Sequence, residues 1–76
     1  MAHLLIHNPK TNIVTIQQPR LGRESEWQES EWTVKYWSNG RMIVSYEVGD
    51  VPHGIERHYI IRECIDNNIY RATWES

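Results

Sequence analysis

The side chains that could carry metal or nucleophilic chemistry are few: four histidines and one cysteine among 76 residues. His3 and His7 are four positions apart, a spacing that puts both on the same face of a strand. Zinc sites usually contain clustered cysteines or two histidines on one face of a helix, and neither pattern occurs in this sequence. The sequence therefore predicts no metal site.

A cysteine nucleophile would need a histidine within hydrogen-bonding reach, and the pair nearest in sequence is His58 and Cys64. Six residues of strand separate two side chains by about 20 Å, and on a helix this spacing places them on different faces. We expect Cys64 to be a small buried apolar residue. The serines lack a GxSxG context, and the four glycines form no phosphate-binding loop. We expect no enzyme and no cofactor.

The segment ESEWQESEW, residues 24–32, concentrates acidic and aromatic side chains. Trp27 lies between four carboxylates, those of Glu24, Glu26, Glu29 and Glu31. Exposed aromatic residues often anchor protein interfaces, and flanking carboxylates speed association with a basic surface. We predict that these five residues bind a partner protein. The alternative is that Trp27 folds back and caps the end of the domain.

The chain reads as one small domain, residues 1–76, in which apolar residues alternate with polar ones. Short alternating runs separated by turn formers predict an all-β fold: a small antiparallel meander of five or six strands, barrel- or sandwich-like. Residues 53–65 also match a short helix. Residues 17–31 contain the breakers Pro19 and Gly22, which predicts a long acidic loop.

Strand register follows from which turn brings apolar residues face to face. In the first hairpin, a loop over residues 9–11 pairs Ile6 with Val14 and Leu4 with Ile16. In the third hairpin, an Asp66–Asn67 turn pairs Ile61 with Ala72 and Tyr59 with Trp74.

The central hairpin contains Asn-Gly, which usually forms a two-residue turn. A three-residue loop over residues 38–40 makes one face wholly apolar, because it pairs Val34 with Val44. It also places Trp37 opposite Arg41 on the outer face, which offers a cation–π pair. We predict the three-residue loop.

That outer face supplies a second functional hypothesis. Lys35, Trp37 and Arg41 are the residue types with which small barrels bind single-stranded nucleic acid. The net charge of −2 and the acidic segment oppose this reading, because phosphate recognition normally needs a basic excess.

We expect a non-enzymatic interaction domain that binds a basic surface of another protein. The more specific hypothesis is an inhibitor of the kind made by phages or mobile elements, or an immunity-like protein. A single-strand-binding module and an oligomeric structural protein are the alternatives. Open edge strands would favour a homodimer. A single cysteine, no leader pattern and no apolar run of membrane length indicate a cytoplasmic protein without membrane contact.

Overall fold

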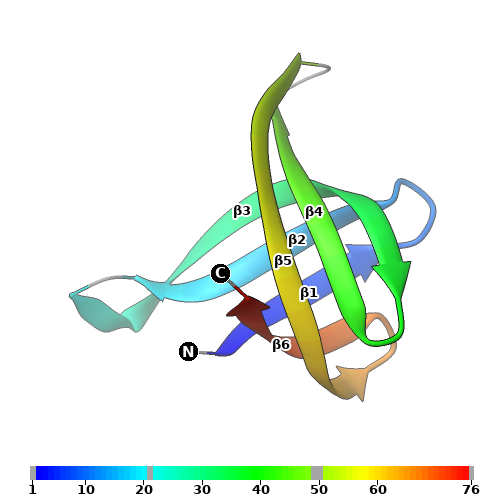
Figure 1. Ribbon diagram of the computed structural model, residues 1–76. Helices are drawn as coiled ribbons and strands as arrows, with labels where there is room; N and C mark the ends of the chain where they lie inside the picture. Colours follow the sequence, from blue (N-terminus) through cyan, green and yellow to red (C-terminus); the bar gives the residue numbers. More distant parts are fainter. Residues whose placement is uncertain (1, 21, 49–50, 76) are drawn as a thin grey trace.

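The computed structural model is a barrel of six antiparallel strands (Figure 1). It describes residues 2–20, 22–48 and 51–75 and, within these, all side chains except those of residues 2, 20, 23–25, 48 and 52. The strands are β1 (Ala2–Asn8), β2 (Ile13–Arg20), β3 (Arg23–Ser38), β4 (Arg41–Val48), β5 (Val51–Asp66) and β6 (Ile69–Glu75).

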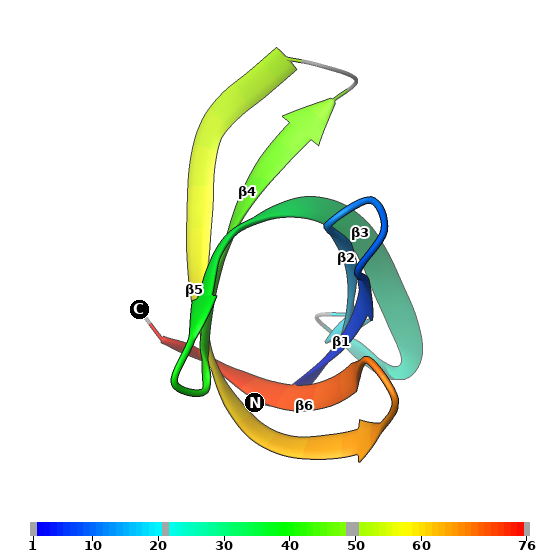
Figure 2. The same ribbon diagram turned by 90° about the vertical axis from the view of Figure 1, so that its right-hand side faces the viewer.

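Each strand pairs with its successor, and β1 pairs with β6 to close the barrel, as the view in Figure 2 shows. The predicted all-β antiparallel meander is confirmed. The helical alternative for residues 53–65 is wrong, because this segment belongs to β5. Its alternate residues Tyr59 and Ile61 face the core, which is the two-residue period of a strand. Within the described residues, no helix is long and apolar enough to span a membrane.

Every strand sends at least one fully or nearly buried side chain into a common core. The core residues are Leu5, Val14, Ile16, Trp32, Val34, Met42, Val44, Tyr59 and Ala72. Side chains of Trp37, Tyr46, Ile61 and Tyr70 pack against this core and are partly buried. So small a domain has few buried residues, and each therefore carries a large share of its stability.

The first hairpin has a different register from the predicted one. Ile6 does not pair with Val14; instead Leu5 pairs with Ile16, and both are fully buried. The turn takes four residues, 9–12, and ends in Asn12 with a positive φ of 59°. This longer turn shifts the pairing by one residue and so exchanges the two faces of β1.

The central hairpin, formed by β3 and β4, contains a two-residue turn, so the predicted three-residue loop is wrong. Asn39 and Gly40 both have positive φ, 53° and 75°, as a type I′ turn requires. The predicted pairing of Val34 with Val44 is nevertheless confirmed, because a bulge at Lys35 inserts one extra residue into β3.

The bulge reverses the faces of the strand between itself and the turn. Trp37 lies opposite Met42 and packs against the core, whereas Tyr36 is 52% exposed. The predicted outward pair of Trp37 and Arg41 is therefore wrong.

In the third hairpin the pairs Ile61–Ala72 and Tyr59–Trp74 are confirmed. The turn is Asn67–Asn68 rather than Asp66–Asn67, and two register shifts in β5 make up the difference.

Two hairpins protrude from the barrel (Figure 1). Residues 17–31, predicted to be a loop, are almost entirely strand: β2 runs to Arg20 and β3 begins at Arg23. We call this segment the acidic arm. Pro19 is tolerated because β1 pairs with β2 only as far as Gln17, so Pro19 lies on an edge strand. The second arm joins residues 46–48 of β4 to residues 51–56 of β5.

The register of β1 predicts a contrast between neighbouring apolar residues. Leu5→Ala should destabilise the domain by about 2–5 kcal/mol, because the side chain is completely buried. Ile6→Ala, at a position that is 36% exposed, should cost less than about 1 kcal/mol. Urea unfolding of both variants measures the difference. Equal losses would contradict the register.

Candidate functional site

The acidic arm presents one regular outer face. From Ile13–Thr33 to Pro19–Trp27 the pairing of β2 with β3 has no register shift, so side chains alternate strictly between faces. Trp27, Glu29 and Glu31 consequently share the outer face of β3.

The other two predicted binding residues lie outside this regular row. Glu26 comes before the last regular pair, Pro19–Trp27, in a stretch where the pairing of β2 with β3 is irregular. The side chain of Glu24 lies outside the described part of the structure. The structure thus brings together three of the five predicted partner-binding residues.

Trp27 is 54% exposed and does not cap the barrel. Its cross-strand neighbour is Pro19, which leaves much of the indole accessible to solvent. Trp32, five residues later in the same strand, is 5% exposed and belongs to the core. The two tryptophans of ESEWQESEW therefore have different environments.

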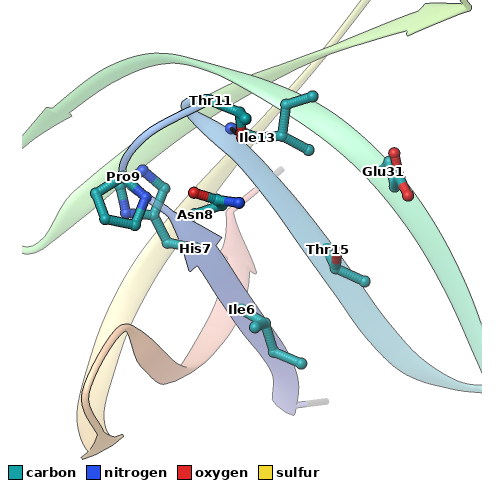
Figure 3. Close-up of a pocket in the computed structure, with 8 residues that line it drawn as sticks. All are labelled: Ile6, His7, Asn8, Pro9, Thr11, Ile13, Thr15 and Glu31. Atoms are coloured by element: carbon teal, nitrogen blue, oxygen red, sulfur yellow. Dashed lines mark hydrogen bonds between the residues drawn. The ribbon is translucent and has the colours of Figure 1, made fainter.

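An open hollow of about 500 Å³ continues the outer face across the first two strands (Figure 3). Ile6 of β1, Ile13 and Thr15 of β2 and Glu31 of β3 form its walls, and the turn after β1 closes one end. Thr15 is the cross-strand partner of Glu31, so the hollow and the row of Trp27, Glu29 and Glu31 are parts of one surface. We call this surface, the row of Trp27, Glu29 and Glu31 together with the adjoining hollow, the outer face of the acidic arm.

Negative charge on this face is not neutralised by any described residue. Three of the chain's basic side chains are already paired elsewhere: Lys35 with Glu47 at 3.8 Å, Arg41 with Glu75 at 3.1 Å, and Arg71 with Glu63. Glu29 accepts a hydrogen bond from the Nε2 of Gln17 at 2.8 Å, and within the described ranges neither Glu29 nor Glu31 forms an ion pair. Glu29 and Glu31 therefore present two carboxylates that have no ion-pair partner among the described residues.

The residues of the nucleic-acid hypothesis do not form one surface. Trp37 is partly buried and packs against the core, with its ring 4.9 Å from that of His7 and 4.8 Å from that of Tyr70. Lys35 is at the bulge of β3, and Arg41 follows the Asn39–Gly40 turn. Both cations form ion pairs with glutamates. Because Trp37 packs against the core, its indole does not lie exposed between them.

At the end of the barrel that carries both arms, a cation contacts two indoles, those of the buried Trp32 and the half-exposed Trp74. The guanidinium carbon of Arg57 is 4.8 Å from the ring centre of Trp32 and 4.9 Å from that of Trp74. Its Nη1 donates to Gln18 Oε1 at 3.4 Å and to the Tyr59 hydroxyl at 3.3 Å. Each contact of this kind contributes about 0.5–2 kcal/mol, more where water is excluded.

The sequence contained a signal for this cluster. The correctly predicted pair of Tyr59 with Trp74 puts both on the inner face, and Arg57 precedes Tyr59 by two residues on the same strand. Arg57 was not among the predicted site residues.

Tyr59 is the ionisable group most affected by its surroundings. Burial raises the pKa of its hydroxyl above the usual 10.0, and the hydrogen bond and positive charge of Arg57 offset part of that effect. The side chain is fully enclosed, so the neutral form is strongly favoured.

Other reactive groups are not assembled into a site. Cys64 is exposed rather than buried, contrary to expectation, and its thiol donates to the backbone oxygen of Asp66 at 3.1 Å. In residues 2–20, 22–48 and 51–75, no group of three His, Cys, Asp or Glu side chains is placed to hold a metal ion.

Comparison of this chain with protein-family models, with curated proteins and with solved structures finds no match.

The raised pKa of Tyr59 predicts a stability loss in alkali. The neutral hydroxyl contributes stability below about pH 10, and this contribution is lost as the pH rises through the raised pKa of the folded state. Between about pH 8 and about pH 11 the wild type should lose more unfolding free energy than Tyr59→Phe, which has no hydroxyl to ionise. Urea unfolding at both pH values measures the two losses. Parallel losses in the two proteins would show that the pKa of Tyr59 is not raised.

Proposed function

We propose that this protein is a non-enzymatic interaction domain that binds a basic surface of another protein through the outer face of the acidic arm. The observation that carries the proposal is the position of Trp27, half exposed on the same strand face as two carboxylates that have no cationic partner among the described residues.

Trp27 suits the centre of such a contact. Half of its surface is available for burial, and tryptophan is among the residues that most often dominate binding energy. Its strand is already paired with β2, so little backbone entropy is lost when a partner covers Trp27. The hollow beside Glu31 gives a partner side chain a place to insert.

Glu29 and Glu31 orient the basic partner and speed its association. Carboxylates on an interface steer a basic partner during encounter, and salt screens this attraction over about 8–10 Å. In the specific form of the proposal, the partner's basic surface is one that binds nucleic acid, and the acidic arm inhibits it by competing with the phosphate backbone.

The first test uses a labelled oligolysine peptide as the basic probe and fluorescence anisotropy as the readout. The double variant Glu29→Lys/Glu31→Lys should weaken binding by about tenfold or more, and Trp27→Ala by about threefold or more. Wild-type binding should weaken as salt rises. Both variants should unfold at the wild-type urea concentration, because all three side chains are exposed.

Matched controls separate this face from general charge and aromatic effects. Glu56→Lys/Asp66→Lys makes the same change in net charge on exposed residues of β5, and Tyr36→Ala removes an aromatic of similar exposure. Both should bind oligolysine much as the wild type does. Equal weakening by the control charge reversal would overturn the proposed site. Binding of a single-stranded oligonucleotide instead of oligolysine would overturn the proposed function.

A further inference from the structure

Closure of the barrel confines the longer unpaired strand edges to the two arms. β3 pairs with β4 only as far as Thr33–Ser45, yet β3 extends back to Arg23 with β2 as its single neighbour. Among the described residues, the side of β3 that faces away from β2 therefore has no adjoining strand over residues 27–31. We call this stretch the β3 edge.

Three other edges on the arms are interrupted. The edge of β2 contains Pro19 and a register shift, and that of β5 contains Pro52 and Gly54, whose φ is +69°. The edge of β4 beyond Ser45 is three residues long and begins with a register shift. Proline, bulges and short length are the features that protect edges from pairing.

The β3 edge has none of these protections. Its sequence is WQESE, without proline, glycine or lysine, and its pairing with β2 is regular from Trp27 to Thr33. Its backbone is therefore ready to accept another strand.

The charge of the β3 edge indicates which strand it accepts. A second copy paired there would place Glu29 and Glu31 beside carboxylates, and like charges across strands are destabilising. A strand with lysine or arginine at alternate positions would instead set its cations beside these glutamates. The edge is thus protected from self-pairing by charge alone, and that protection favours a basic partner.

We propose that an extended basic segment of the partner protein adds as a strand to the β3 edge, so that backbone hydrogen bonds hold it and its alternate cations lie beside Glu29 and Glu31. This inference rests on the proposed function and specifies how the partner is bound. Side chains on one face of the added strand would also contact Trp27, which lies in the same row.

The test compares two peptides of equal charge. One alternates lysine and threonine; the other has the same sequence but is N-methylated at every residue, which removes all its backbone donors. The first should bind at least about tenfold more tightly, because only it can form the ladder. Hydrogen exchange should show alternate amides within residues 27–31 becoming protected by the first peptide alone.

Two outcomes overturn the inference. Equal affinity of the two peptides, or binding of the first without protection of amides in residues 27–31, would mean that contact is made by side chains only. The proposed function would survive that result, because oligolysine binding and its loss in Glu29→Lys/Glu31→Lys test it separately. The same charge-reversed variant should also abolish binding of the lysine–threonine peptide, whereas Glu56→Lys/Asp66→Lys should not.

Discussion

The rest of this structure depends on the pairing of β1 with β6, which converts a six-stranded meander into a closed barrel. Closure requires each strand to turn one face towards a common interior, and in a short chain that interior has room for few side chains. The bulge at Lys35 and the two register shifts of β5 meet this requirement. They allow each turn its preferred geometry and still bring Val34, Met42 and Ala72 to the inside.

Both ends of the barrel are filled by aromatic residues that also carry polar groups, in a chain without phenylalanine. At the end with the tight turns, Trp37 packs between His7 and Tyr70. At the end with the arms, Arg57 lies between Trp32 and Trp74. A guanidinium between two indoles tolerates partial exposure better than an aliphatic plug would, because its remaining donors can reach water.

Sequence reasoning found the fold class because residue alternation and turn chemistry are local signals. It failed where two local signals conflicted. Asn39–Gly40 favoured a two-residue turn and the match of Val34 with Val44 favoured three, and both features coexist because a bulge lies between them. No pattern in the sequence marks Lys35 as the bulged residue. The prediction of a loop over residues 17–31 was wrong. Proline breaks a central strand, but Pro19 lies on an edge strand, which accepts it.

The same mistake explains why the candidate site was only partly predictable. With residues 17–31 read as a loop, four glutamates around Trp27 appeared equivalent. In the regular part of the strand the side chains alternate, and the odd-numbered Glu29 and Glu31 share a face with Trp27. Parity also separates the two tryptophans of the segment: an odd spacing of five puts Trp27 outside and Trp32 inside one continuous strand. The repeated ESEW thus places Trp32 in the core and leaves Trp27 on the surface, so that substitution of Trp32 removes a core side chain and substitution of Trp27 does not.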